Sequence, residues 1–443
     1  MNKVFKKITT SRIIIFGFLG VILLGAFLLM LPISVRGEQF ASFFDSLFTS
    51  TSAVCVTGLV VHDTATYWSL FGQAVILVLI QIGGLGVITI AALIALVSGR
   101  KIGLIQRSLM QESLSAPQMA GIVKLTTFIL KTTLIFEGAG MIALAFRLCP
   151  DMGFLKGLWY SLFHAVSAFC NAGFDLMGTA DAQYVSLTNY ADSPLINIAV
   201  IMLIVIGGIG FLTWDDIKTK RLHFRKYRMQ SKVILSVTFL LIAVPAVYNF
   251  FFEFSDFNIK ERILTSLFQA VTPRTAGFNT VDYNSMSESG VAGTIVLMLI
   301  GGSPGSTAGG MKTTTLAVLA ASAFTVFGRK DEPSFFHRSI GKQVVAQASA
   351  ILFMYLTLFF TGGLIISRVE HLPVIDCLFE TASAIGTVGL TLGLTPTLSA
   401  VSRIILIMLM FLGRVGGLTF VYATVSKVGV SGTKLPPEKI TVG

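Results

Sequence analysis

Eight stretches of this sequence are apolar and long enough to cross a lipid bilayer, and they restrict the fold more than any other feature. They lie near residues 13–32, 70–97, 124–148, 193–214, 233–252, 291–325, 343–367 and 401–425. About 20 consecutive apolar residues are needed to span a membrane as a helix. Only 12% of the 443 residues are charged, whereas about a quarter are charged in an ordinary soluble domain. The chain is therefore predicted to be an all-α membrane protein with eight transmembrane helices.

A shorter, half-apolar segment follows the first span of each pair, at 40–52, 157–168, 260–271 and 373–384. Such a segment is too short to cross and is typical of a re-entrant loop. Each contains a Leu-Phe pair, then polar and small residues, then a glycine followed by Leu or Phe. These glycines are Gly58, Gly173, Gly277 and Gly389. A second glycine cluster follows inside each next span, at 82–86, 206–210, 301–310 and 413–417.

Two motifs that recur in step indicate internal repetition. The predicted units are 13–97, 124–214, 233–325 and 343–425, and each consists of a helix, a pore loop and a second helix. All four units cross in the same direction, and parallel repeats are related by an axis along the membrane normal. Four such units predict a pseudo-tetrameric pore like that of a potassium channel.

Lys and Arg residues are concentrated on one side of the predicted spans. Most of the 33 lie in the N-terminal segment 1–12, the connections 98–124, 215–232 and 328–342, and the tail 426–443. By the positive-inside rule both termini are predicted to be cytoplasmic, so the pore loops open outward. Topology thus accounts for the net charge of +11, which argues against nucleic-acid binding. The outer segments carry carboxylates that would concentrate cations, namely Asp63, Asp175, Asp181, Asp192, Asp282 and Glu288.

The pore loops have the residue types of a cation selectivity filter. A dehydrated cation is held by rings of backbone carbonyls, and glycine permits the positive φ that turns carbonyls toward an axis. Glycines that merely permit tight packing would explain one such loop but not four in register. The predicted filter, with potassium at its carbonyls, consists of Val56, Thr57, Gly58, Asn171, Ala172, Gly173, Thr275, Ala276, Gly277, Thr387, Val388 and Gly389.

A gate is predicted below this filter. Residues 301–311 contain Pro304 and five glycines, so they cannot form a continuous helix, and irregular backbone at membrane depth lines a cavity or is buried in protein. Arg414 lies in the middle of the last span, where a positive charge would oppose cation flow. The alternative is a kink needed only for packing. The predicted gate residues are Gly301, Gly302, Gly305, Gly309, Gly310, Lys312 and Arg414.

Three other polar side chains at membrane depth are candidates for a role, because ionisable groups are costly there. Arg274 is expected either to brace the third loop or to bind a carboxylate such as Glu380. Glu137 is either functional or makes a structural hydrogen bond to a neighbouring helix. Asn171 is expected to brace the filter backbone, with direct ion ligation as the alternative.

These motifs resemble the Trk/Ktr/HKT superfamily of potassium transporters, and within it the KtrB-type (or KtrD) membrane subunits. The likeness covers 12–425 and is strongest in VTGLVVHDT, IQIGGLG, FHAVSAFCNAGF, QAVTPRTAGFN, the segment 301–313 and FETASAIGTVGLTLGLTP. It implies a homodimer in the plasma membrane with one pore per subunit, a gating loop at 301–313 and a gating arginine at Arg414. It also implies a cytosolic ring of KtrA/KtrC-type regulatory subunits that binds ATP or ADP, and potassium uptake stimulated by sodium.

Two functions on this scaffold remain open at this stage. The first is a gated potassium uptake pore, and the alternative is a coupled sodium–potassium symporter, which carboxylates in the pore would favour. No constellation of nucleophile, base and acid is present in the spans, so the chain is predicted not to be an enzyme. It is also expected to carry no covalent cofactor and to bind no nucleotide, because GGSPGSTAGGMK lacks the GK[ST] ending of a phosphate-binding loop.

Overall fold

The structure is a computed structural model that describes residues 10–37, 40–97, 102–114, 118, 121–221, 223–417 and 419–420. In this part the chain is mostly helical, and its one sheet is the hairpin of β1 (Ser334–Phe335) and β2 (Arg338–Ser339). The predicted N-terminal segment 1–12 lies mostly outside the described residues, and the tail 426–443 lies wholly outside them.

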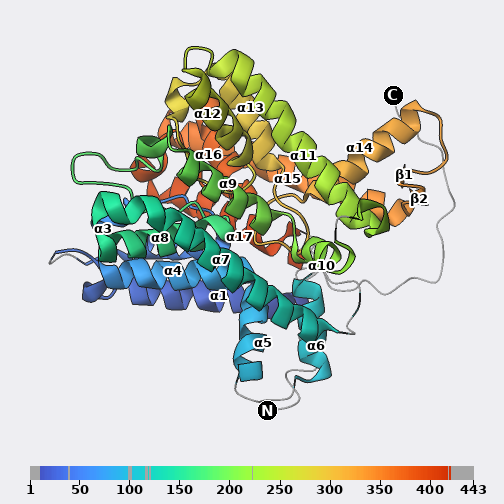
Figure 1. The fold of residues 1–443 in the computed structure, drawn as a ribbon, viewed down its shortest axis with the longest axis horizontal. Helices are drawn as coiled ribbons and strands as arrows, with labels where there is room; N and C mark the ends of the chain where they lie inside the picture. Colours follow the sequence, from blue (N-terminus) through green and yellow to red (C-terminus); the bar gives the residue numbers. More distant parts are fainter. Residues whose placement is uncertain are drawn as a thin grey trace.

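A long helix, a short helix and an interrupted helix follow one another four times along the described chain (Figure 1). The long helices are α1 (Thr10–Leu29), α7 (Ile122–Met152), α11 (Met229–Tyr248) and α15 (Lys342–Glu370). The short helices are α2 (Phe43–Cys55), α8 (Phe154–Phe169), α12 (Ile259–Val271) and α16 (Val374–Gly386). Three interrupted helices are α4 (Leu70–Leu85) with α5 (Val87–Val97), α9 (Pro194–Gly208) with α10 (Phe211–Lys220), and α13 (Glu288–Leu299) with α14 (Thr313–Phe327). The fourth is α17 (Ala400–Val415), which is interrupted at Gly416.

Smaller elements connect these helices. They are the 3-10 helices η2 (Pro32–Ser34), η3 (Thr188–Tyr190), η4 (Phe224–Lys226), η6 (Tyr283–Ser285) and η7 (Thr395–Thr397), the π-helix η5 (Asn249–Glu253), and the α-helices α3 (Thr64–Tyr67) and α6 (Leu104–Ser113). Side-chain caps position the short helices α2 and α12, since Ser42 accepts a hydrogen bond from the Asp45 amide and Asn258 accepts one from the Glu261 amide, each at 3.1 Å. Such caps satisfy amides that have no partner within the helix.

In the described residues, four single helices are long and apolar enough to cross a membrane: α1, α7, α11 with its π-helical extension to Glu253, and α15. The pair α9–α10 has the length of a span but is bent by 97°. The chain is a multi-pass helical membrane protein, as predicted. The structure adds that the second span of each set is interrupted, whereas the sequence located a break only in 291–325.

These interruptions occur at the glycine clusters. Gly86, Gly210 and Gly416 have φ values of 86°, 89° and 86°, a conformation that ends an α-helix and that glycine adopts readily. One turn earlier, the interrupted helix packs against the end of the short helix of its own set. A Cβ at those positions would overlap a backbone carbonyl of the short helix: Gly83 meets Val54, Gly207 meets Phe169 and Gly413 meets Ile385.

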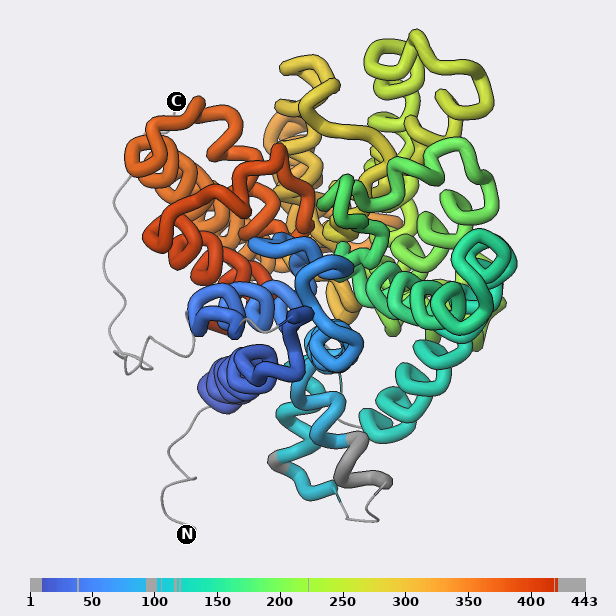
Figure 2. Tube along the Cα trace, turned by 90° about the vertical axis from the view of Figure 1, so that its left-hand side faces the viewer, coloured from blue at the N-terminus to red at the C-terminus, as the bar shows by residue number. Residues whose placement is uncertain are grey.

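The four sets follow one another around a common centre, as Figure 2 shows by the progression of colour around the molecule. The interrupted helix of each set also packs against the short helix of the next set. The pairs are α4 with α8, α9 with α12, α13 with α16, and α17 with α2. The last pair joins the fourth set to the first, so the arrangement closes into a ring.

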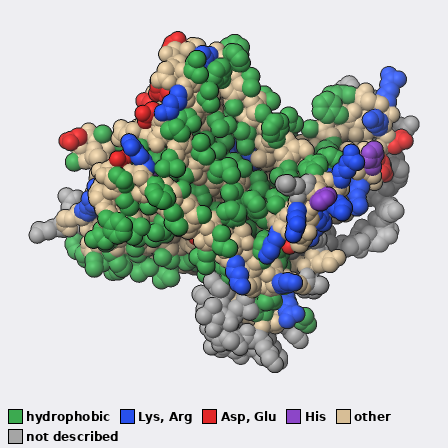
Figure 3. All heavy atoms as spheres, in the orientation of Figure 1, with side chains coloured by type: hydrophobic (Ala, Val, Ile, Leu, Met, Phe, Trp, Pro, Cys, Tyr) green, Lys and Arg blue, Asp and Glu red, His purple; other side chains and the backbone are tan. Residues whose placement is uncertain are grey.

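The short helices form the core, and the long helices form the outside. In α16, every residue from Phe379 to Gly386 is buried. The long helices instead expose large apolar side chains, such as Phe146 at 74% and Phe353 at 75%, as expected where lipid is the solvent. Hydrophobic side chains cover much of the surface in Figure 3, and Lys and Arg side chains gather toward one end, near α10.

Candidate functional site

Four glycines meet at the centre of the ring of helices. Gly58, Gly173, Gly277 and Gly389 follow the C-terminal ends of the four short helices, and we call them the glycine ring. Each faces the carbonyl of the middle residue in the next loop. A Cβ on Gly58 would lie 2.5 Å from Ala172 O, one on Gly173 2.8 Å from Ala276 O, one on Gly277 2.5 Å from Val388 O, and one on Gly389 would meet Thr57 O. Four loops distant in sequence thus close on one another in cyclic order.

One unusual backbone feature is shared by all four loops. The first residue of each predicted triplet is left-handed, with φ of 57° at Val56, 58° at Asn171, 66° at Thr275 and 51° at Thr387. Positive φ is uncommon for residues other than glycine and is unfavourable for β-branched side chains. Strain of this kind is maintained only where the surroundings enforce it, and it concentrates at functional sites. The sequence predicted positive φ at the glycines but did not indicate it at these preceding residues.

Hydrogen bonds from the short helices hold the loops, and they divide the loops into two pairs. In the first and fourth loops a serine hydroxyl accepts the ring-glycine amide: Ser52 from Gly58 and Ser383 from Gly389, each at 3.0 Å. In the second and third loops, a hydroxyl donates instead to the carbonyl of the residue that follows the ring glycine. Ser167 donates to Phe174 O at 2.7 Å, and Thr272 donates to Phe278 O. These four hydroxyls are site residues that sequence reasoning did not select.

The third loop differs from the others by one residue. In the other three loops, the amide of the middle residue of the triplet bonds to the carbonyl five residues earlier, for example Val388 N to Ser383 O at 2.8 Å. In the third loop Ala276 N bonds to Thr272 O, four residues earlier, at 3.0 Å. The spacing of Phe268 to Gly277 in the sequence, one residue shorter than in the other units, is the visible signal of this difference.

Three threonine hydroxyls in these loops are buried without a hydrogen-bond partner: those of Thr57, Thr275 and Thr387. Buried polar atoms are normally paired, and of these three the Thr387 hydroxyl lies against Gly309 of the predicted gate segment. Asn171 is placed differently, because its amide nitrogen lies 3.5 Å from Ile204 O and its Oδ1 lies 3.0 Å from the Thr307 hydroxyl. Its side chain therefore connects the second loop to α9 and to the predicted gate segment.

The segment 301–313, which we call the intramembrane loop, lies directly against this ring. Thr307 Oγ1 is 2.9 Å from Phe169 O at the end of α8. A Cβ on Gly309 would overlap the Thr387 side chain, and one on Gly310 would lie 2.9 Å from Gly386 O. The loop is also bonded to two glycine clusters, through Ser303 N to Gly208 O at 3.0 Å and Gly310 N to Gly413 O at 3.3 Å.

Arg414 connects the intramembrane loop to the first set. Its guanidinium donates to Thr307 O in the loop and to Gly83 O and Gly84 O at the end of α4, the last at 3.1 Å. Lys312 Nζ folds back onto the same loop and donates to Ala308 O at 2.8 Å. The predicted gate residues are thus brought together, and the glycine clusters of all four sets meet around the intramembrane loop.

Two hollows adjoin the ring and the loop, and we name them outer and inner after the predicted orientation. The outer hollow, of about 60 Å³, is lined by the whole glycine ring together with Asp63 and Asp175. The inner hollow, of about 290 Å³, is lined by Gly305, Lys312, Arg414 and residues of α1, α4 and α6. The glycine ring therefore lines one hollow, and the intramembrane loop lines the other.

The outer hollow has an acidic rim. Asp63 Oδ1 accepts the amides of Ala65 and Thr66 at 3.1 and 2.9 Å, and its Oδ2 accepts the Tyr184 amide at 2.9 Å. Asp175 accepts only the Met177 amide, at 2.9 Å. Burial raises the pKa of Asp175 to about 7, and the nearby Asp63 carboxylate acts in the same direction. A carboxyl with this pKa would gain its charge as the pH rises through about 7.

Arg274 and Glu380 do not form the ion pair that was one of the two expectations for Arg274. The Arg274 guanidinium donates to Thr238 Oγ1 at 3.3 Å. Glu380 accepts hydrogen bonds from Thr395 Oγ1 at 2.6 Å and from the Leu392 amide at 3.2 Å. Both groups bond to nearby neutral partners instead of to each other, although Arg274 Nε is buried without a hydrogen-bond partner, so the pairing prediction is wrong.

Glu137 is buried beside the second loop without being part of the glycine ring. Its carboxylate accepts a hydrogen bond from Gln81 Nε2 on α4 at 3.3 Å. Cys170, the residue before Asn171, lies 3.6 Å from Gln81 Oε1 through its Sγ. This is the hydrogen bond to a neighbouring helix that was one of the two expectations for Glu137.

Comparison with known proteins shows the family of the chain. The family model for TrkH, a cation transport protein, matches residues 7–428. The chain is 40% identical to Ktr system potassium uptake protein B of Bacillus subtilis (strain 168) and 39% identical to potassium/sodium uptake protein NtpJ of Enterococcus hirae, in both cases over 100% of this chain and 99% of the relative.

A solved structure has the same fold. The potassium transporter TrkH from Vibrio parahaemolyticus superposes with a TM-score of 0.74 at 20% identity, covering 94% of this chain and 84% of that one. The relatives are transport proteins, which confirms that this chain is not an enzyme. The chain belongs to the TrkH family of cation transport proteins and is of the KtrB type within the Trk/Ktr superfamily.

Proposed function

We propose that this chain is the membrane subunit of a Ktr-type system and takes up potassium through the glycine ring. The observation that carries the proposal is the cyclic closure of four loops, in which the carbonyls of Thr57, Ala172, Ala276 and Val388 each face a glycine of the adjacent loop. Rings of carbonyl oxygens replace the hydration shell of a potassium ion. The relatives named for potassium uptake support potassium as the ion.

Uptake would be driven by the membrane potential, which is worth about 2.3 kcal/mol per charge per 100 mV. The acidic outer hollow gathers cations, and the ring selects among them. The intramembrane loop then controls passage to the inner hollow, with Arg414 holding it in place through Thr307 O. Opening requires the loop to leave its contacts with Phe169 O and Gly413 O.

A growth test in bacteria that lack potassium uptake examines this function. The Gly277→Ser variant adds a side chain where a Cβ would lie 2.5 Å from Val388 O and 2.8 Å from Gly173 Cα, at a φ of 81°. The matched control is Gly293→Ser on the exposed face of α13, where a Cβ meets nothing within 4 Å. We expect the parent and control to restore growth at low potassium and Gly277→Ser to fail. Equal growth of both variants would refute the role of the ring.

The alternative is a coupled sodium–potassium symporter. The relative named for potassium and sodium uptake favours it, as does the buried carboxyl of Glu137. However, Glu137 bonds to Gln81 behind the second loop and does not line the outer hollow, so the pore is the better supported function. Potassium flux into proteoliposomes with and without sodium, at a clamped potential, separates the two, because obligatory coupling abolishes flux without sodium.

We further propose that the subunit works as a homodimer in the plasma membrane, with both termini cytoplasmic and a KtrA/KtrC-type nucleotide-binding ring beneath it. The Ktr system name of a relative 40% identical over the whole chain supports a partner system. The basic end near α10 supports the orientation. Light scattering of the purified subunit and its co-purification with a tagged regulatory ring test the assembly.

A further inference from the structure

A groove outside the pore lies where α7 begins and α10 ends, at the basic end of the molecule. It has a volume of about 440 Å³ and lies beside the start of α11. Its lining combines cationic and apolar side chains, which no step of the proposed transport mechanism uses. The lining residues on which the argument depends are Lys124, Lys218, Arg228, Phe128, Leu125 and Asp215.

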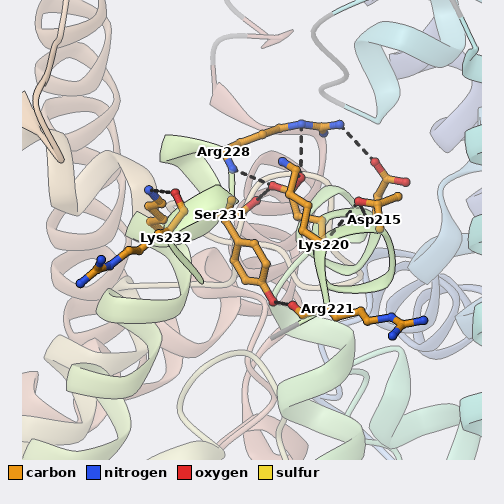
Figure 4. Close-up of polar contacts among 10 residues, drawn as sticks. Asp215, Lys220, Arg221, Arg228, Ser231 and Lys232 are labelled. Atoms are coloured by element: carbon orange, nitrogen blue, oxygen red, sulfur yellow. Dashed lines mark hydrogen bonds and ion pairs between the residues drawn. The ribbon is translucent and has the colours of Figure 1, made fainter. Parts of the chain in front are cut away.

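The acidic groups near the groove are already engaged by other residues (Figure 4). Asp216 is fully buried and accepts hydrogen bonds from Lys220 Nζ at 2.6 Å, Ser231 Oγ at 2.7 Å and the Arg228 amide at 3.0 Å. Asp215 pairs with the Arg228 guanidinium at 3.1 Å. These bonds hold the turn between α10 and α11 in place without neutralising the two lysines of the groove.

Lys124 and Lys218 have no carboxylate partner among the described residues. Lys218 Nζ instead lies 4.7 Å from the centre of the Phe128 ring. Lys124 lies in the first turn of α7, a turn with no acidic residue and no side-chain cap. A cation is unfavourable at that end of a helix, so the excess positive charge of the groove is best satisfied by an added anion.

The floor of the groove continues onto the lipid-facing surface of α7. Phe128 lies in the floor, and Ile135 lies seven residues later, which places it on the same face of the helix. Ile135 is 67% exposed and its neighbour Leu134 is 69% exposed. Cations beside a largely apolar helix face, which the exposed Lys131 interrupts, match an anion attached to acyl chains rather than a free anion.

We propose that this groove binds the phosphodiester headgroup of an anionic phospholipid, with its acyl chains along α7. Basic pockets between helices at the cytoplasmic surface recognise such headgroups. Lys124 and Lys218 contact the phosphate while Arg228 stays paired with Asp215, and Phe128 and Leu125 contact the start of the chains. The site is next to the transport machinery, because Phe211 N, at the start of α10, bonds to Gly305 O of the intramembrane loop at 2.8 Å.

Native mass spectrometry of the full chain in detergent tests this site. The probes are dioleoyl-phosphatidylglycerol and the zwitterionic dioleoyl-phosphatidylcholine, each titrated onto the delipidated protein. The test variant is Lys124→Gln with Lys218→Gln. The matched control is Arg225→Gln with Lys226→Gln, which removes the same charge from exposed positions of η4 outside the groove. A third variant, Lys124→Arg with Lys218→Arg, keeps the charges.

We expect phosphatidylglycerol to bind the parent more tightly than phosphatidylcholine. The glutamine pair should weaken that binding about thirtyfold, at about fivefold per lysine, while the control pair and the arginine pair retain it. The proposal is overturned if the glutamine pair binds phosphatidylglycerol like the parent, which would assign these cations to a protein partner. It is also overturned if phosphatidylcholine binds equally well, or if millimolar inorganic phosphate displaces the lipid, which would indicate a free-anion site.

Discussion

Arg414 offers the sharpest test of the proposed gate, because one side chain holds the intramembrane loop against the first set. Its guanidinium makes three hydrogen bonds to backbone carbonyls, to Thr307, Gly83 and Gly84. A hydrogen bond to a charged group contributes about 1.5 kcal/mol at the low end of its range, so the three contribute about 4.5 kcal/mol. In Arg414→Ala, water in the inner hollow, which Arg414 lines, would offset about half of the free energy lost with these three hydrogen bonds. The remaining ~2 kcal/mol corresponds to about a thirtyfold shift of the equilibrium between the closed and open conformations of the intramembrane loop, toward the open one.

We therefore expect Arg414→Ala to raise resting potassium flux in proteoliposomes severalfold to about thirtyfold, with unchanged selectivity at the ring. Arg414→Lys separates two explanations, because it keeps the positive charge but lacks the planar donors that reach several carbonyls at once. If the bonds hold the loop, the lysine variant leaks like the alanine variant. If charge repulsion alone blocks the path, it stays closed.

A deletion within 302–310 is the companion variant, since it removes the loop and keeps Arg414. It should also raise resting flux. The gate hypothesis fails if Arg414→Ala and the deletion both conduct and close like the parent. Size-exclusion profiles of the purified variants check that any loss of flux is not a loss of fold.

Three further predictions concern the mouth, the loops and the buried carboxyl. The pKa of Asp175 is raised to about 7, so its carboxylate ionises as the external pH rises through 7. The apparent potassium affinity should then improve about fivefold, which corresponds to an interaction of about 1 kcal/mol. Asp175→Asn should abolish this pH dependence. The double variant Ser52→Ala with Ser383→Ala removes two hydrogen bonds to ring glycines, each worth about 1 kcal/mol. The selectivity for potassium over sodium in flux assays should therefore fall. Unchanged selectivity would contradict bracing of the ring by these hydroxyls. Glu137→Gln should leave potassium flux and its sodium response unchanged, and a lost sodium response would favour the symporter.

Much of the fold could be predicted from local sequence. The four glycines and their following clusters were visible because backbone that turns sharply, or approaches another chain closely, tolerates only glycine. The left-handed residues before the ring glycines were not visible. Val56 and Thr387 carry β-branched side chains that disfavour positive φ, and here the surrounding helices enforce that conformation.

The sequence by itself predicted four units that run in one direction and loops that converge, because repetition and the distribution of charge are local properties. Tertiary structure decided the contacts between units. Arg414 reaches Gly83, 331 residues away, and Arg274 meets Thr238 rather than Glu380. A side chain at membrane depth bonds to whichever partner the packing brings within reach, and backbone carbonyls, which every residue carries, leave no signal in the sequence.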